Sequence, residues 1–189
     1  MKFTETPLAG CFVITLDRID DERGFFARTF CREAMAEHGC ATTVAQTSMA
    51  TNHHRGTLRG LHVLLPDPAL PHHALETKLV RCTRGAVFDV LVDLRAESAT
   101  FGQSFGVTLD AEQHQSVYVA AGVAHGYQVL KAQTDLHYMM SVPYGTGIDS
   151  GVRWNDPSLA IAWPLPEEVT VSERDAALPT LAQWQSQHH

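Results

Sequence analysis

The chain has 189 residues, 44% of them hydrophobic, and a formal net charge of -7 at pH 7. This length suits one domain with a sizeable core and is short for two, so we expect a single domain over residues 1–189. The negative charge, without a basic run, argues against nucleic-acid binding through phosphates. No apolar run approaches the ~20 residues that cross a bilayer and no leader pattern opens the chain, which predicts a soluble, cytoplasmic protein that does not bind membranes.

The first third of the chain predicts strands around one short helix. We expect an opening strand at residues 11–16, ended by a turn at residues 20–24. Residues 32–38 have the pattern of a helix that ends at Gly39, a glycine suited to a C-cap. Strands follow at residues 44–49 and 57–65, and three prolines then predict a loop at residues 66–71.

The stretch RGTLRGLH at residues 55–62 is the most informative part of this region. Strict strand alternation places Leu58, Gly60 and His62 on one face and Arg59 on the other. Gly60, lacking a side chain, would leave room for a ligand to approach the backbone beside His62. An imidazole in that position can move protons near neutral pH, although a structural histidine at a strand end explains the pattern equally simply.

Residues 78–142 form a succession of short strands with turn signals every eight to twelve residues, which is typical of a β-sandwich or barrel. Asp89 and Asp93 interrupt one face of a strand whose other face is apolar. Tyr138 projects with an apolar set. The last forty residues are rich in proline, with a helical turn expected at residues 172–175 and a helix at 178–185, and they are expected to pack outside the barrel.

Cysteines and histidines give no sign of a metal site or a disulfide framework. The four cysteines lack a C-x-x-C pair, so we expect reduced or buried thiols: Cys11, Cys31, Cys40 and Cys82. Adjacent histidines on a strand point to opposite faces, so the pairs His53-His54 and His72-His73 are poor chelates. His188 and His189 end the chain and resemble the remnant of an expression tag.

Eight short blocks recur in an order that identifies a family: RGFF (23–26), RGTLRGLH (55–62), KLVR (78–81), RGAVFDV (84–90), VDLR (92–95), SATFG (98–102), GVAHG (122–126) and WNDP (154–157). In this order and spacing they resemble the dTDP-4-dehydrorhamnose 3,5-epimerase family of cupin-like sugar-nucleotide epimerases, over nearly the whole chain. The resemblance implies an all-β, cupin-like jelly-roll barrel with short peripheral helices. It also implies a cofactor-free enzyme that inverts C3, C5 or both in a dTDP-4-keto-6-deoxyhexose.

The resemblance assigns four catalytic residues. Deprotonation beside a ketone needs a base, a cation for the enolate oxygen and an acid on the far face, and the matching residues are His62, Lys78 and Tyr138. Asp175, in the Ser-x-x-Asp segment that begins at Ser172, would hold the base. By pattern alone these residues are a strand lysine reaching solvent, a core tyrosine and a capping box.

The resemblance also assigns substrate contacts. Arginine forks suit a diphosphate, and Arg59 and Arg23 match the positions that bind it, Arg23 being lent by the neighbouring subunit. The other matches are His125 in the pocket, Phe26 and Tyr144 stacked on the thymine ring, and Gln46 against the nucleoside. A homodimer that exchanges N-terminal strands is therefore expected.

The chain departs from the family pattern beside several of these residues, at Thr47, Ser48, Val63, Leu64, Met139 and a longer loop over residues 66–73. The departures spare the catalytic set but leave open which nucleotide and sugar are used and which carbon is inverted. A 3,4-ketoisomerase of the same substrate class is one alternative, although Tyr138 favours inversion. A metal-dependent cupin oxygenase lacks its H-x-H pair here, and a non-catalytic sugar-nucleotide-binding cupin would not need the catalytic set.

Overall fold

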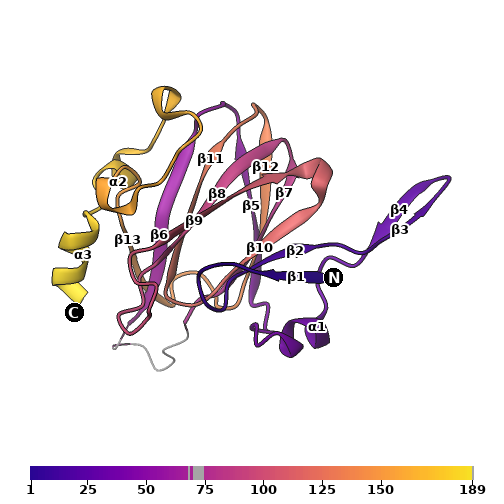
Figure 1. Ribbon diagram of the computed structural model, residues 1–189, viewed down its shortest axis with the longest axis horizontal. Helices are drawn as coiled ribbons and strands as arrows, with labels where there is room; N and C mark the ends of the chain where they lie inside the picture. The colour runs from indigo at the N-terminus through magenta and orange to yellow at the C-terminus, as the bar shows by residue number, and fades with distance from the viewer. Residues whose placement is uncertain (68, 70–74, 189) are drawn as a thin grey trace.

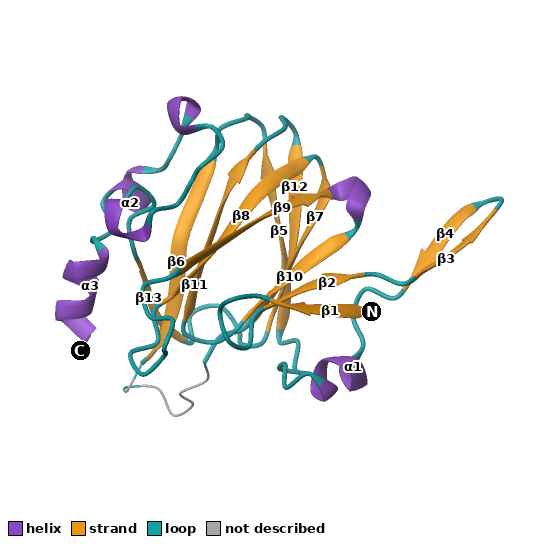
Figure 2. Ribbon diagram, viewed as in Figure 1, coloured by secondary structure: helices purple, strands orange, loops and turns teal. Residues whose placement is uncertain are grey.

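The computed structural model describes residues 1–67, 69 and 75–188, and its body is a barrel of two antiparallel sheets (Figures 1 and 2). The six-stranded sheet has the order β1 (Lys2–Glu5), β2 (Phe12–Thr15), β10 (Gln115–Val119), β7 (Lys78–Arg84), β12 (Thr134–Met140) and β5 (Gln46–Asn52). The five-stranded sheet has the order β13 (Gly147–Gly151), β6 (Leu58–Pro66), β11 (Val123–Val129), β8 (Ala86–Asp93) and β9 (Ser104–Asp110). The all-β class with short peripheral helices is confirmed.

A two-stranded hairpin and a few short helices lie outside these sheets. The hairpin joins β3 (Arg18–Asp21) to β4 (Gly24–Ala27) and projects away from the barrel (Figure 1). The α-helices are α1 (Arg32–Glu37), α2 (Glu173–Ala176) and α3 (Leu181–His188). Single 3-10 turns are η1 (Ala111–Gln113), η2 (Pro157–Leu159) and η3 (Pro166–Glu168). No helix in the described ranges has the length and apolar character needed to span a bilayer.

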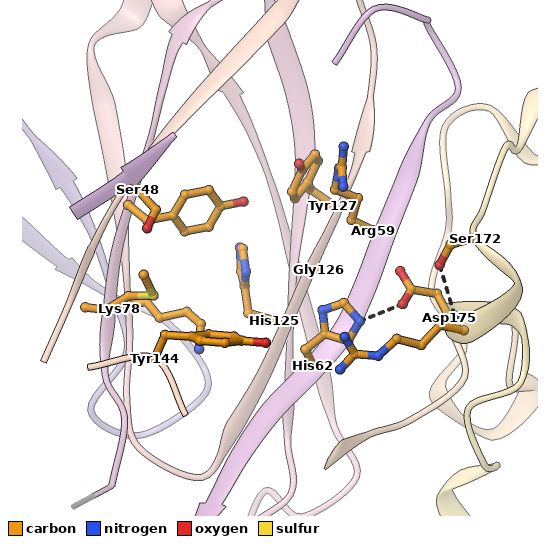
Figure 3. Close-up of a pocket in the computed structure, with 13 residues that line it drawn as sticks. Ser48, Arg59, His62, Lys78, His125, Gly126, Tyr127, Tyr144, Ser172 and Asp175 are labelled. Atoms are coloured by element: carbon orange, nitrogen blue, oxygen red, sulfur yellow. Dashed lines mark hydrogen bonds and ion pairs between the residues drawn. The ribbon is translucent and has the colours of Figure 1, made fainter. Parts of the chain in front are cut away.

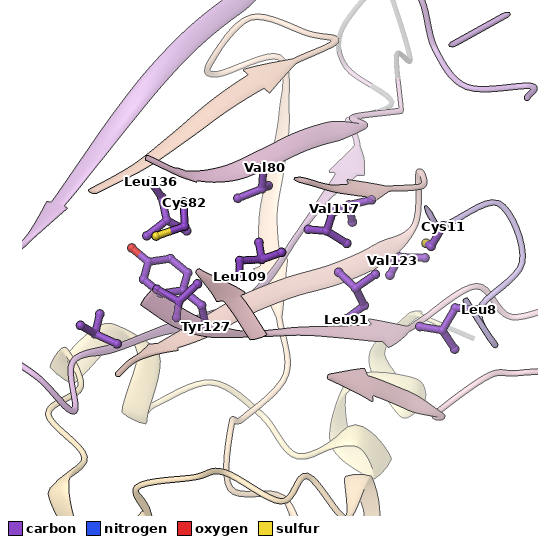
Figure 4. Packing of buried hydrophobic residues seen from close by; sticks show 13 residues of the cluster. Leu8, Cys11, Val80, Cys82, Leu91, Leu109, Val117, Val123, Tyr127 and Leu136 are labelled. Atoms are coloured by element: carbon purple, nitrogen blue, oxygen red, sulfur yellow. The ribbon is translucent and has the colours of Figure 1, made fainter. Parts of the chain in front are cut away.

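Two apolar cores cover the two faces of the five-stranded sheet. The barrel interior is filled from both sheets by side chains that include Val80, Leu91, Leu109, Val117 and Leu136 (Figure 4). The outer face of the five-stranded sheet is covered by the C-terminal tail, in a cluster that includes Leu61, Val90, Val92, Trp163 and Trp184. The expectation that the tail packs outside the barrel is therefore confirmed, and this packing carries α2 to the end of β6.

The predicted elements are confirmed in kind and corrected in extent. The expected opening strand is preceded by β1, and the turn expected at residues 20–24 is the tip of the β3–β4 hairpin. The strand expected at residues 44–49 covers Gln46–Asn52, and the terminal helix begins at Leu181 instead of residue 178. All four cysteines are free, as expected. The histidine pair at residues 72–73, His189 and most of the loop predicted after Pro66 lie outside the described residues.

Strict alternation at Gly60 is wrong, because β6 and β11 come unusually close there. Their register shifts between the pairs His62–His125 and Arg59–Tyr127, a local irregularity in the ladder. A Cβ on Gly60 would lie 2.6 Å from Gly126 Cα, so Gly60 admits the neighbouring strand and not a ligand. The shift turns Arg59 and His62 to the same side of β6, whereas alternation had placed them on opposite sides.

Candidate active site

A cavity of about 540 Å³ opens between the two sheets and collects polar side chains from both (Figure 3). His62 lies on β6 of the five-stranded sheet, whereas Lys78 and Tyr138 lie on β7 and β12 of the facing six-stranded sheet. A second cavity of about 450 Å³ adjoins the first and shares His62 and Lys78 with it. A ligand in the first cavity would therefore meet a histidine from one wall and an amine and a phenol from the other.

His62 and Asp175 form a hydrogen-bonded dyad. His62 Nε2 lies 2.8 Å from Asp175 Oδ1, although 113 residues separate the two in sequence. The second carboxylate oxygen of Asp175 accepts a hydrogen bond of 3.0 Å from the backbone N–H of Gly60. Because the carboxylate accepts the proton on Nε2, Nδ1 of His62 is the nitrogen left free to act as a base.

The N-terminus of α2 fixes Asp175. Ser172 is the N-cap of this helix, and its hydroxyl accepts a hydrogen bond of 3.1 Å from the backbone N–H of Asp175. Asp175 is buried although it lies on a four-residue helix, because the tail packs on the sheet. Ser172 and Asp175 thus form a helix cap, as the pattern alone suggested, and the same cap delivers the dyad carboxylate.

Lys78 points into the cavity from a largely buried position. Its Nζ forms an ion pair with Glu76, and both side chains are less than one-fifth exposed. Burial lowers the pKa of the Lys78 ammonium to about 8, while the charge of Asp149 opposes that shift. A lysine held in this way is a cation near neutral pH and faces the space where a ligand oxygen would develop charge.

Tyr138, a partly buried residue, presents its phenol to the same space. Its ring packs edge-on to His125, with ring centroids 6.1 Å apart. Burial raises the pKa of Tyr138 well above its ordinary value, and the charge of Asp89 adds to that rise. The phenol is therefore protonated at neutral pH and suited to donate a proton.

His125 belongs to a second dyad, which the sequence did not reveal. His125 Nε2 lies 2.8 Å from Asp89 Oδ2, and both side chains are buried. Burial raises the pKa of Asp89, while the charge of His125 opposes the rise. The other oxygen of Asp89 has no hydrogen-bond partner among the described residues. The one signal for Asp89 was an acidic residue inside an otherwise apolar strand.

The polar contacts at the cavity rim involve three of the predicted binding residues. Arg59 Nε donates to Asn52 Oδ1 at 3.0 Å, which holds the arginine at the cavity. Gln46 Oε1 accepts a hydrogen bond of 2.7 Å from the backbone N–H of Tyr144. Tyr144 is 84% exposed and lines both cavities, so its ring is available at the entrance.

Arg23 and Phe26 are the two predicted site residues that one chain does not bring to the cavity. Arg23 lies in the turn of the β3–β4 hairpin and pairs with Asp21, while Phe26 is 73% exposed on β4. The hairpin points away from the barrel (Figure 1). Either these residues have no part in the site, or they reach the cavity of another copy.

Several cavity residues had no motif in the sequence. Those that approach the catalytic set are Ser48, Glu76, Tyr127, Met140 and Arg174. Within the described ranges, no three His, Cys, Asp or Glu side chains are grouped as a metal site would require. The cavity brings together groups suited to acid-base chemistry, with the imidazole of His62 on one wall and the ammonium of Lys78 and the phenol of Tyr138 on the other.

The chain is similar to known sugar-nucleotide epimerases in sequence and in structure. The family model for dTDP-4-dehydrorhamnose 3,5-epimerase matches residues 5–183. A dTDP-4-dehydrorhamnose 3,5-epimerase from Sinorhizobium fredii is 35% identical over 183 residues, covering 97% of this chain and 91% of that protein. The crystal structure of a 3,5-epimerase from Legionella pneumophila in complex with dTDP-4-keto-L-rhamnose has a TM-score of 0.87 at 34% identity and covers 98% of this chain and 95% of that one. A 3'-monoepimerase from Streptomyces bikiniensis, solved with dTDP-quinovose, has a TM-score of 0.86 at 34% identity and covers 96% of this chain and 89% of that one.

Proposed function

The chain belongs to the dTDP-4-dehydrorhamnose 3,5-epimerase family, and from this we propose how its cavity inverts a sugar carbon. The protein is an isomerase, an epimerase of a dTDP-4-keto-6-deoxyhexose in deoxysugar biosynthesis, with a cupin-like fold. In our proposal, a proton beside the 4-ketone leaves toward one wall of the cavity, and a proton returns from the other wall.

The base is His62. Its Nδ1 takes the C–H proton, the electron pair moves toward the ketone, and the oxygen becomes an enolate. Asp175 accepts the Nε2–H bond at 2.8 Å and stabilises the imidazolium that forms. Lys78 stabilises the enolate oxygen from the facing sheet, where its partly desolvated ammonium interacts more strongly than it would in water.

The acid is Tyr138. Its neutral phenol gives a proton to the carbon from the side opposite His62, which inverts the configuration. The observation that carries the proposal is this placement: the imidazole comes from β6 of one sheet and the phenol from β12 of the other. A 3,4-ketoisomerase does not require an acid facing the base, and a non-catalytic binding module requires neither residue, so both alternatives account for less of the site.

Arg59, Tyr144, Gln46 and His125 bind the substrate in this proposal. Arg59 meets the diphosphate, Tyr144 stacks on the thymine at the rim, and Gln46 holds the backbone of Tyr144. His125, fixed by Asp89, lines the sugar pocket. Relatives with similar identity to this chain include a 3,5-epimerase and a 3'-monoepimerase, so inversion of C3, C5 or both stays a question for experiment.

The protein acts as a homodimer in this proposal. Ile19 and Phe26 are 69% and 73% exposed on a hairpin that extends from the barrel (Figure 1), a feature that a second copy would cover. In the dimer, Arg23 of the partner subunit reaches the diphosphate and Phe26 of the partner subunit faces Tyr144 across the thymine. The single domain over residues 1–189 and the cytoplasmic location stay predictions.

Proton exchange tests the catalytic assignment. The protein is incubated with dTDP-4-keto-6-deoxyglucose in deuterated water, and NMR follows the label and the configuration at C3 and C5. His62→Ala should lower exchange at both carbons by about 10² to 10⁴ fold. Tyr138→Phe should keep the first exchange and lose inversion. Wild-type exchange in His62→Ala would show that another group is the base.

A further inference from the structure

Tyr127 is a buried phenol of the cavity for which the mechanism above has no use. It lies on β11, is only 2% exposed, and contributes to the cavity wall next to Gly126 (Figure 3). Its hydroxyl donates to Asn52 Oδ1 at 3.3 Å, the same oxygen that accepts Arg59 Nε at 3.0 Å. The Asn52 amide therefore links Tyr127 to the arginine at the cavity mouth.

Tyr127 is also a neighbour of the proposed acid. Tyr138 packs against the core cluster that contains Tyr127, and His125 lies 6.3 Å from the ring of Tyr127 and 6.1 Å from that of Tyr138. Burial raises the pKa of both phenols; their mutual interaction adds to the rise at Tyr138 and opposes it at Tyr127. Before reaction, the Tyr127 O–H points to Asn52.

Proton donation changes Tyr138 from a hydroxyl that can donate a hydrogen bond to a phenolate that must accept one. When the O–H bond of Tyr138 breaks and the new C–H bond forms, the electron pair stays on the phenol oxygen as a buried anion. A buried anion without a donor is costly. The charge of Asp89 disfavours this phenolate and that of Arg59 favours it. Tyr127 carries the hydroxyl proton that can turn from Asn52 to the phenolate.

We propose that Tyr127 is a positioning residue for inversion, whose hydroxyl leaves Asn52 and donates to the Tyr138 phenolate as the sugar carbon is protonated. This role rests on the proposed function, because it acts only through Tyr138 as the acid. Once Tyr138 has given up its proton, Tyr127 stabilises the anion until the proton is replaced. The deprotonation by His62, on the other wall, does not need it.

The variant that tests this is Tyr127→Phe, which keeps the ring and removes the hydroxyl. Deuterium exchange by His62 should stay within about twofold of wild type, while inversion per exchange event falls about 10- to 100-fold, the effect expected for one hydrogen bond to a charged group. The matched control is Tyr118→Phe. Tyr118 is equally buried, but its hydroxyl is bonded to the backbone N–H of Ala41 outside the cavity. This control should keep the wild-type ratio of inversion to exchange.

A double-mutant cycle with Tyr138→Phe decides whether Tyr127 acts through the acid. In the Tyr138→Phe background, Tyr127→Phe should change neither exchange nor residual inversion. An unchanged ratio of inversion to exchange in Tyr127→Phe, or additive losses in the double variant, would overturn the proposal. Failure of the proposed function is distinguishable, since wild-type protein would then show no exchange. Circular dichroism and thermal melting exclude a folding defect as the cause of any loss.

Discussion

At the scale of single residues, the dyad occupies Nε2 of His62 with a hydrogen bond and leaves Nδ1 free to accept one. Asp175 accepts from both His62 and the backbone N–H of Gly60. An asparagine at residue 175 could still accept from Gly60, but its amide N–H₂ would then face His62 Nε2 as a donor. The imidazole would respond by carrying its proton on Nδ1, the nitrogen that must accept the substrate proton.

Asp175→Asn should therefore lower proton exchange by about 10² to 10⁴ fold with little change in substrate affinity. Deuterium uptake by the substrate measures the first quantity, and titration calorimetry with dTDP measures the second. The control is Glu168→Gln, which changes an exposed carboxylate paired with Arg55 on the surface. Exchange at the wild-type rate in Asp175→Asn would mean that the carboxylate does not set the tautomer of His62.

The lowered pKa of Lys78 predicts that activity falls at alkaline pH. Its lowered pKa, about 8, means that the ammonium loses its proton as pH rises through that value, and with it the charge that stabilises the enolate. Glu76 in contact with Nζ favours the charged form, so the midpoint should lie at or slightly above pH 8. We expect kcat to fall above this midpoint, and Glu76→Gln to move the midpoint to lower pH. A kcat profile from pH 6 to 10 measures both.

The conservative variant Lys78→Arg tests whether Lys78 is the group that causes the fall of kcat at alkaline pH. Lys78→Arg keeps the charge far above pH 10, so its kcat, although lower at pH 7 from altered geometry, should show no fall near pH 8. Lys78→Ala should lose about 10² to 10³ fold at pH 7, as removal of one oxyanion donor does. An unchanged alkaline limb in Lys78→Arg would assign the titration to another group.

At the scale of elements, the approach of β6 to β11 decides which residues face the substrate. Gly60 has φ +119°, and an added Cβ would lie 2.6 Å from Gly126 Cα and 2.8 Å from the carbonyl oxygen of His125. Both obstacles are backbone, so neither can rotate away. The pairing of two glycines from distant parts of the chain therefore creates the register shift that turns His62 into the cavity.

Gly60→Ala should cost about 2 to 5 kcal/mol in the free energy of unfolding, from left-handed strain and overpacking together. Gly39→Ala is the matched control, because Gly39 has φ +69° with nothing within 4 Å of an added Cβ. Gly39→Ala should lower the free energy of unfolding only by the left-handed backbone strain, about 1 to 2 kcal/mol. Urea unfolding measures both. Equal losses in the two variants would mean that β6 and β11 can separate without cost.

The close approach of β6 to β11 also marks the limit of what the sequence could predict. The strands were predictable, because their apolar alternation and turn residues are local. The face presented by His62 was not, because it depends on a contact between Gly60 and Gly126 that no local pattern contains. Asp89 and Asn52 were missed for the same reason: the partner of Asp89 comes from a neighbouring strand and that of Asn52 from the facing sheet, and only the folded sheets bring them together.

At the scale of the whole molecule, the β3–β4 hairpin projects from the barrel and exposes apolar side chains (Figure 1). Its Ile19 and Phe26 stay largely exposed among the described residues, and Arg23, in the turn of the hairpin, is not one of the residues that line the cavity beside Arg59. The family resemblance predicted Arg23 and Phe26 as binding residues, and neither lines the cavity of its own chain. In the proposed dimer, each hairpin would lie at the cavity of the other chain.

Mixed dimers test that exchange directly. Arg23→Ala alone should weaken substrate binding, and His62→Ala alone should abolish exchange. If Arg23 acts in the partner's site, a heterodimer of the two variants contains one intact site, with His62 from one chain and Arg23 from the other. Refolding the two variants together at equal amounts should then restore about a quarter of the wild-type sites, because half of the dimers are mixed and each has one good site.

The alternative arrangement predicts a different number. If Arg23 served its own chain, every site in the mixture would lack either Arg23 or His62, and mixing would restore nothing. The assay is substrate deuterium uptake at a dTDP-sugar concentration that does not saturate Arg23→Ala, with each variant alone as the control. Light scattering on the same samples must give the mass of a dimer. A monomer, or a mixture no more active than its components, would remove the partner's arginine from the active site.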